Sequence, residues 1–397
     1  MSQKEVVIVG AGVIGCSIAY HLAKRGVPSQ IIERDSIAAR ASGKSWAVFG
    51  YPPGLLQMEG QPTEQLFSVP VGSMGPWLEL VWLGYHRLPD VALDLQEKGG
   101  IDIGYGELPW IKVALSESDE MSLKEGLSLQ KSRGYYEGYW IEADDLRNLF
   151  PDINPLARGG VVVPYLQVEP YRYTLGLAQA AEKMGASIRQ GEVVGFRHKG
   201  SKLTAVVLAT GTEVEADVVV LAMGPWSGQG ISQLGKEMPI LINREQCLQM
   251  QVPQRLPPYA LSSAGLVIIP KVDGSVILGH AGEADLQATP DVSQTTEEAK
   301  MKLISDAIDV LPTLNDAELV EHRGDFECWP PPPNRMQPVL GRLPQWDNAY
   351  IATRFGTIGM MASLGVGQVM ADVIIADGRI PSRVKTMMEV LSPAKLQ

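Results

Sequence analysis

Three glycines near the N-terminus, Gly10, Gly12 and Gly15, have the spacing G-x-G-x-x-G. In this spacing the first glycine allows a tight turn, the second lets a pyrophosphate approach the backbone, and the third lets a helix pack on a strand. A helix beginning in the turn, at Val13 and Ile14, offers free N–H groups and a partial positive charge to phosphates. The spacing therefore predicts a dinucleotide-binding turn.

Glu33 is the acidic residue that such a site needs, at the expected distance beyond Gly15. A carboxylate at this position accepts hydrogen bonds from the adenosine ribose hydroxyls. It would repel a 2′-phosphate, which favours FAD or NAD over NADP. The alternative is a glycine turn of an α/β fold that binds nothing, but the acid together with the flanking pattern favours dinucleotide binding.

The flanking residues predict the elements that position this turn. Val6 to Val9 is a β-branched run typical of a strand buried on both faces. Apolar residues recur every four positions over 14–22, as on one face of an amphipathic helix, and Gly26 is suited to end that helix. A second strand is predicted over 29–32, and Glu33 follows directly after it.

Composition excludes several classes of protein. Of 397 residues, 45% are apolar and 20% charged, as in an ordinary globular protein. Acidic residues outnumber basic ones, 45 to 34, and no Lys/Arg-rich run occurs, so we expect no nucleic-acid partner. The three cysteines, Cys16, Cys247 and Cys328, are far apart and odd in number, which favours a reducing compartment.

Neither a targeting segment nor a membrane span is predicted. The first strand begins by Val6, which leaves no room for a charged and then an apolar leader region. The longest charge-free run, 355–371, is broken by glycines and Gln368, so we interpret it as a buried loop and helix. The five histidines show no ligand spacing, and no metal site is predicted. We expect a cytoplasmic protein.

Five further segments follow one another in the order of a known family: ARASGKSW (39–46), VEPYRYTLGLAQAAEKMGA (168–186), GEVVGF (191–196), ADVVVLAMGPWS (216–227) and LVIIPKVDGSVILGH (266–280). With them, the sequence resembles the D-amino-acid oxidase-type (DAO) family of FAD-dependent oxidoreductases, nearest to its glycine oxidase and sarcosine oxidase branch. The resemblance covers nearly the whole chain.

The resemblance implies FAD as the cofactor and assigns residues to its site. Segment 39–46 is similar to the loop that wraps the pyrophosphate and the flavin edge, 191–196 to the strand that meets the adenine, and 216–227 to a segment beside the flavin. Together with the glycine motif, the implied residues are Gly10, Gly12, Val13, Ile14, Gly15, Glu33, Arg34, Ala41, Ser42, Lys44, Ser45, Val193, Gly224 and Trp226.

The C-terminal block is expected to meet the other end of the cofactor. AYIATRFG (349–356) predicts a strand, and a glycine-rich turn then enters a helix. The resemblance places this turn at the pyrimidine end of the flavin, where N–H groups at a helix N-terminus suit the negative charge left by hydride transfer. The candidates are Gly356, Thr357, Ile358 and Gly359; the alternative is a plain strand–helix connection.

The predicted architecture is α/β with two domains. A discontinuous Rossmann-like FAD-binding domain is expected over residues 1–50, 143–227 and 336–397. Residues 51–142 and 228–335 are expected to form an antiparallel β-sheet domain that binds the substrate. The second of these insertions contains alternating strand patterns followed by a charged, helix-like stretch.

The resemblance implies oxidation of a C–N bond by hydride transfer to flavin N5, followed by hydrolysis of the imine. The substrate anchors of the branch are absent. In WPPPPNRMQPVLG (329–341) a proline replaces the usual arginine, and 359–361 reads Gly-Met-Met where relatives have GFK. Either another cation, Arg354, Arg172 or Arg244, binds a carboxylate, or the substrate has none. Met360 and Met361 would then form an apolar, adaptable wall.

Two further residues are candidates for the reaction. His280 ends the predicted hairpin where a base or an orienting group could act, although a structural histidine is the alternative. Cys328 aligns with a cysteine that some relatives attach to the flavin, and the alternative is a free buried thiol. The prolines that follow predict a stiff path between substrate domain and flavin.

The leading interpretation is thus an FAD-dependent amine or amino-acid oxidase or dehydrogenase. Its partners would be a small-molecule amine or amino acid and oxygen or another electron acceptor, and an oligomer is possible. One alternative is a flavoprotein of this fold with a binding or assembly role. Another is an NAD-linked enzyme, which the segments after Glu33 disfavour.

Overall fold

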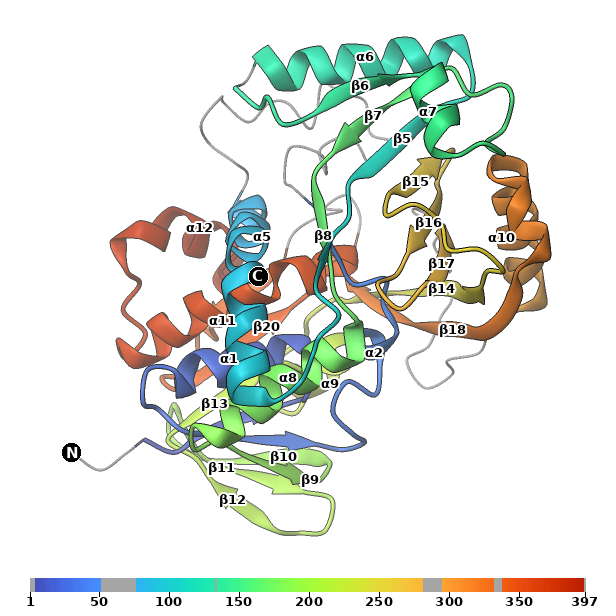
Figure 1. Ribbon diagram of the computed structural model, residues 1–397. Coiled ribbons are helices and arrows are strands. Elements are labelled where there is room, and N and C mark those ends of the chain that lie inside the picture. Colours follow the sequence, from blue (N-terminus) through green and yellow to red (C-terminus); the bar gives the residue numbers. More distant parts are fainter. Residues whose placement is uncertain (1–3, 51–75, 133, 281–294, 332–337, 396–397) are drawn as a thin grey trace.

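The computed structural model describes residues 4–50, 76–132, 134–280, 295–331 and 338–395, and it contains two large β-sheets (Figure 1). The first has six strands and is parallel apart from its β19 edge. Its order is β19 (Val339–Arg342), β20 (Ala349–Thr353), β13 (Val218–Leu221), β1 (Val6–Val9), β2 (Ser29–Glu33) and β9 (Ser187–Gln190). All four residues of β1 are buried, which confirms the predicted strand.

Helices from distant parts of the chain pack together beside the parallel sheet. Helix α1 packs against α8 and α11, and α11 also packs against α5. Their bounds are α1 (Val13–Ala23), α5 (Pro76–Asp94), α8 (Pro170–Lys183) and α11 (Gly359–Ile375). Close approach explains the glycines of α11, because a Cβ on Gly365 would lie 2.4 Å from the Leu80 carbonyl oxygen.

Helix α11 is also the segment that raised the question of a membrane span. Among the described residues, Gly356–Ile375 is the one helical stretch long and apolar enough to cross a bilayer, with a mean hydropathy of 1.7. Of its most apolar window, 78% is buried inside the protein. The run is therefore part of the core between α1 and α5, as the glycine-interrupted sequence predicts.

The second sheet has eight strands, and its β15–β5 pair is parallel whereas its other pairs are antiparallel. Its order is β18 (Glu318–Trp329), β14 (Leu241–Gln251), β17 (Ser275–His280), β16 (Leu266–Pro270), β15 (Ala260–Ser263), β5 (Trp110–Ala114), β7 (Gly159–Val163) and β6 (Tyr139–Glu142). Helix α6 (Glu117–Ser132) lies along β5–β7, and α10 (Glu297–Val310) lies over β14, β16 and β17 (Figure 1).

Smaller elements complete the described chain. One three-stranded sheet consists of β10 (Val193–Lys199), β11 (Lys202–Leu208) and β12 (Glu213–Glu215), and another of β3 (Val48–Gly50), β8 (Tyr165–Gln167) and β4 (Gly106–Glu107). The short helices are α2 (Ala41–Lys44), α7 (Ala143–Leu149), α9 (Ser227–Ser232) and α12 (Lys385–Val390). Single turns occur at Leu95–Gly99, Gly224–Trp226, Pro312–Asp316, Gly356–Ile358, Ser382–Val384 and Pro393–Lys395.

The predicted class, α/β with a Rossmann-like sheet and a largely antiparallel second sheet, is confirmed. The domain bounds remain a prediction, and two strands within 143–227 pair with strands of 51–142: β7 pairs with β5 and β6, and β8 pairs with β4. Much of the proline path falls on 332–337, which lie outside the described residues, so its rigidity also remains a prediction.

Candidate functional site

The glycine turn between β1 and α1 has the geometry that its spacing predicts. Gly10 has φ +108°, and a Cβ there would lie 2.5 Å from the Ala222 carbonyl oxygen. A Cβ on Gly15 would lie 2.0 Å from the Gly10 carbonyl oxygen, so the third glycine lets the helix sit against the turn. Any side chain at these two positions would force the backbone apart. The turn is therefore closed by contacts that only glycine permits.

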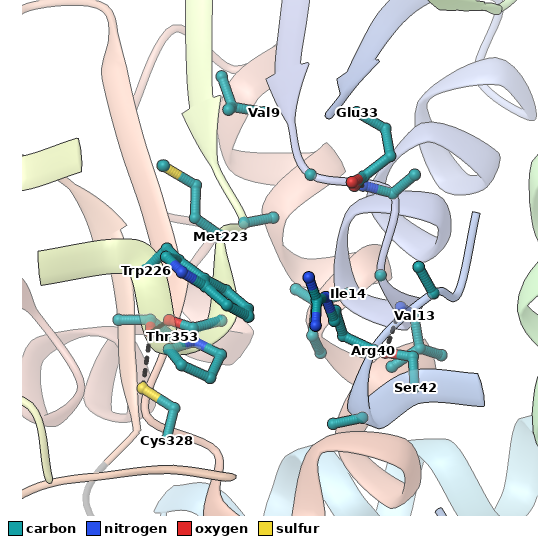
Figure 2. Close-up of a pocket in the computed structure, with 18 of the residues that line it drawn as sticks. Val9, Val13, Ile14, Glu33, Arg40, Ser42, Met223, Trp226, Cys328 and Thr353 are labelled. Carbon is teal, nitrogen blue, oxygen red and sulfur yellow. Dashed lines mark hydrogen bonds between the residues drawn. The ribbon is translucent and has the colours of Figure 1, made fainter. Parts of the chain in front are cut away.

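Glu33 lies at the end of β2 with its carboxylate facing this turn (Figure 2). Its Oε2 accepts a hydrogen bond of 2.7 Å from the Ala11 N–H, and its Oε1 accepts one of 2.9 Å from the Asp35 N–H. Each oxygen retains acceptor capacity. The carboxylate is thus fixed in place while remaining able to accept hydroxyl hydrogen bonds.

The polar loop around α2 reaches the start of helix α1. The Ser42 hydroxyl accepts a hydrogen bond of 2.9 Å from the Val13 N–H (Figure 2). Lys44 points elsewhere, because its ammonium donates to Asp325 Oδ2 at 3.0 Å and to the Gly324 carbonyl at 3.2 Å. Lys44 therefore connects this loop to β18 of the larger sheet.

Trp226 faces two arginines across the cavity. The Arg34 guanidinium lies 4.2 Å from the centre of the indole, and that of Arg40 lies 5.5 Å away. Figure 2 shows Arg40 and Trp226 at this cavity. The Asp35 carboxylate holds both arginines in place, because its Oδ2 lies 3.4 Å from Arg34 Nε and 3.1 Å from Arg40 Nη2. Such a cation–π arrangement orients the arginines along the cavity wall.

The turn before α11 closes the other end of the cavity. Gly356 has φ +47°, and a Cβ there would lie 2.8 Å from the indole of Trp329. A single turn over Gly356–Ile358 leads into α11 at Gly359. The N–H groups at the start of α11 are therefore presented beside the cavity, since the first turn of a helix leaves its donors unpaired.

Cys328 lies at this end, on strand β18. Its Sγ is 3.4 Å from Thr353 Oγ1, and Thr353 donates a hydrogen bond of 3.3 Å to the Gly224 carbonyl (Figure 2). Burial raises the pKa of the Cys328 thiol, and its hydrogen bonds with the Thr353 side chain and the Arg354 backbone offset only part of that rise. The group is a protonated thiol at neutral pH.

Arg354 follows β20 in a left-handed conformation, with φ +62° and 3% exposure. Its Nη2 donates to the Pro239 carbonyl oxygen, and burial lowers the pKa of the guanidinium. Its Nε is buried without a hydrogen-bond partner. One side of this cation is thus committed to the backbone while another donor stays unsatisfied.

A single cavity joins these parts. Of the residues assigned to the cofactor, those that line it are Gly10, Gly12, Val13, Ile14, Glu33, Arg34, Ala41, Ser42, Ser45, Val193, Gly224, Trp226, Gly356, Thr357 and Gly359. The remaining three, Gly15, Lys44 and Ile358, pack behind the wall or bind β18. Cys328 and Arg354 also line the cavity.

Four other candidates are not among the residues that line this cavity. The His280 ring lies 3.5 Å from Lys302 and 3.6 Å from Asp306, both on α10. Met361 is buried, and its Sδ is 3.4 Å from the Gly50 nitrogen. Arg172 is exposed in the first turn of α8, and Arg244 lies on β14. The roles assigned to these residues remain predictions.

Several cavity residues were not assigned from the sequence, notably Arg40, Met223 and Glu327. Arg40 directly precedes the small-residue loop and Glu327 directly precedes Cys328, so adjacency to recognised motifs was the available signal. Three buried polar atoms of lining residues have no hydrogen-bond partner: Ser45 Oγ, Trp226 Nε1 and Arg354 Nε. An unpaired buried polar atom usually has a specific explanation, and a polar ligand in this cavity is one explanation for these three.

Comparison with known proteins gives a consistent result. The family model described as DAO, FAD dependent oxidoreductase, matches residues 5–373. A glycine oxidase of Bacillus licheniformis is 25% identical over 378 residues, which span 94% of this chain and 93% of that protein. The crystal structure of glycine oxidase from Bacillus cereus superposes with a TM-score of 0.82 at 24% identity, covering 99% of this chain and 100% of that one. L-proline dehydrogenase from P. horikoshii has a TM-score of 0.76 at 18% identity, with 99% and 97% coverage.

Proposed function

Because this chain belongs to the DAO family of FAD-dependent oxidoreductases, we propose that it oxidises the C–N bond of a small amine or amino acid. The observation that carries the proposal is the single cavity just described. One end is the glycine turn at Gly10, and the other is bordered by Cys328, Arg354 and the turn at Gly356. A cofactor held by the first end would meet, at the second, residues of both sheets.

The cofactor of the family is FAD, and the described residues fit it. Gly12 leaves the backbone of the turn open to a pyrophosphate, and Glu33 keeps acceptor capacity for ribose hydroxyls. Ser45 and Trp226, whose Oγ and Nε1 have no hydrogen-bond partner, also line this cavity. When bound, FAD supplies the hydride acceptor that no side chain can provide.

The protein's own part in the reaction is to position the substrate and to stabilise charge. N–H groups at the start of α11, beside Gly356 and Gly359, favour negative charge at that end of the cavity because they are fixed before the reaction begins. Buried apolar residues such as Met360 and Phe355 border the same end and exclude water.

Substrate choice is the open part of the proposal. Of the three arginines considered as carboxylate anchors, only Arg354 lines the cavity, and its Nη2 is bound to a backbone carbonyl. That bond occupies one arm of the guanidinium, whereas an arginine that binds a carboxylate usually directs two parallel N–H groups at it. Both an amine and an amino acid therefore belong in the test.

The test begins with the absorption spectrum of the purified protein, in which the absence of flavin would refute the proposal. The coloured protein is then titrated anaerobically with glycine, sarcosine, L-proline, benzylamine and hexylamine. Bleaching by any of them supports C–N oxidation, and peroxide formation on admission of air then identifies an oxidase rather than a dehydrogenase. Colour that survives every compound would favour a binding or assembly role.

A further inference from the structure

Glu327 is an acidic residue of the cavity that neither the glycine turn nor the resemblance explains. It lies on β18 next to Cys328, and it is only partly exposed. Its Oε2 accepts a hydrogen bond of 2.8 Å from Trp329 Nε1. The Asn243 amide, directly opposite on β14, lies 3.5 Å from the same oxygen. The carboxylate is held by two neutral donors.

The position of Trp329 shows which end of the cavity Glu327 borders. The indole that donates to Glu327 also packs against Gly356, the first residue of the turn before α11. Glu327 is therefore at the end bordered by Cys328 and Arg354, opposite the glycine turn that suits the pyrophosphate. This is where a substrate would lie under the proposed function.

Within the described parts of the chain, no Lys, Arg or His forms an ion pair with Glu327. The nearby cations have other partners, since Lys44 is paired with Asp325 and Arg354 donates to Pro239. Neutral hydrogen bonds compensate only part of the cost of desolvating a carboxylate. Burial accordingly raises the pKa of Glu327 to about 7. An incoming cation would supply the missing charge.

We infer that Glu327 binds the cationic nitrogen of the substrate, so that the site selects amines by their positive charge. The inference rests on the proposed function and deepens it by naming the group that is recognised. It also explains how a site without the usual carboxylate anchors can hold a small molecule, because a hydrogen bond between charged groups is roughly twice as strong as a neutral one. The competing explanation is that Glu327 only fixes Trp329.

The test measures binding without turnover. Holoprotein reduced beforehand with dithionite cannot oxidise an amine, so hexylammonium and 1-hexanol can be titrated into it anaerobically and followed by calorimetry. The two ligands have the same chain and differ in charge, so the ratio of their affinities reports recognition of the cation. Three proteins are compared: wild type, Glu327→Gln, and the control Glu318→Gln, which makes the same change at an exposed position of the same strand.

Wild type is expected to prefer hexylammonium to hexanol by roughly tenfold or more, as one charged hydrogen bond would give. Glu327→Gln should remove this preference while leaving hexanol affinity and FAD content unchanged, and Glu318→Gln should keep it. Glu327→Asp, which retains the charge, should restore part of it. Absence of a preference in wild type, or its persistence in Glu327→Gln, would overturn the inference.

These outcomes are separable from failure of the proposed function. If amines bleach the flavin and Glu327→Gln changes neither binding nor bleaching, the assignment of Glu327 alone is wrong. If no compound bleaches the flavin although wild type prefers hexylammonium, the cavity binds amines but the proposed oxidation is wrong. If Glu327→Gln lost hexanol binding as well, the residue would instead be supporting Trp329 and the shape of the cavity.

Discussion

Replacement of Gly356 by alanine should be costly for two separable reasons. At φ +47° the left-handed backbone of an alanine costs roughly 1–2 kcal/mol of folding free energy relative to glycine. Its Cβ would also lie 2.8 Å from the Trp329 indole, and relieving such an overlap typically costs about 1–3 kcal/mol. We therefore expect Gly356→Ala to lower the free energy of unfolding by about 3 kcal/mol.

The backbone contribution can be measured alone at Gly26. This glycine has φ +72°, and a Cβ there would meet no atom within 4 Å. Gly26→Ala should therefore cost only the backbone strain, about 1 kcal/mol. Both variants change the unfolded chain in the same way, so the loss of unfolded-state entropy cancels in the comparison.

Urea unfolding of the holoprotein, followed by far-UV circular dichroism, provides the measurement for Gly26→Ala, Gly356→Ala, Trp329→Ala and the double variant. If the overlap with Trp329 is the second cost, Gly356→Ala should cost less in the Trp329→Ala background, by about 1–2 kcal/mol. Equal costs for Gly26→Ala and Gly356→Ala, or no coupling between positions 356 and 329, would refute the reasoning.

Three further predictions concern charged and reactive groups. Lys44→Ala should lower the free energy of unfolding by about 3 kcal/mol, because it leaves the buried Asp325 carboxylate without its cation. Asp325→Asn should lower the free energy of unfolding by less. A larger loss for Asp325→Asn than for Lys44→Ala in urea unfolding would contradict this explanation. Acid precipitation of wild type should leave all yellow colour in the supernatant, because the Cys328 thiol stays protonated and is a poor nucleophile. If the wild-type pellet is yellow and the Cys328→Ser pellet is not, the flavin is instead covalently linked to Cys328. The pKa of Glu327 rises from its ordinary value of 4.5 to about 7 on folding. Between pH 4.5 and 7 the carboxyl is therefore ionised in the unfolded chain but protonated in the folded protein, so the free energy of unfolding should fall as the pH rises through this interval. Relative to Glu327→Gln, wild type should lose at most about 3 kcal/mol over this interval, and parallel pH profiles for the two proteins would show that the carboxyl does not titrate in this range.

The dinucleotide end of the site could be predicted because its requirements are local. Gly10 and Gly15 are needed by a turn whose geometry depends on residues close in sequence, and Glu33 follows at the end of the next strand. The start of helix α8 is also set by local features, because it begins at Pro170 and the Glu169 side chain accepts a hydrogen bond of 2.6 Å from the Arg172 N–H.

The substrate end could not be predicted in the same way because it depends on contacts between distant segments. The role inferred for Glu327 depends on its hydrogen bonds with Trp329 and Asn243 and on the absence of a paired cation among the described residues. No local sequence pattern predicts such contacts. His280 was chosen for its place at a strand end. The structure puts its ring beside Asp306, because α10 lies over that end of β17.

Strand β18 has a consequence for how this protein could change over evolutionary time. Its pairing with β14 is continuous from Trp329 opposite Leu241 back to Glu321 opposite Gln249, and it places Phe326, Glu327 and Cys328 in fixed order along the cavity. A one-residue insertion or deletion in this stretch would move every following side chain to the other face of the sheet. Lineages that acquire new substrates are therefore expected to exchange single residues here while keeping the length of the strand.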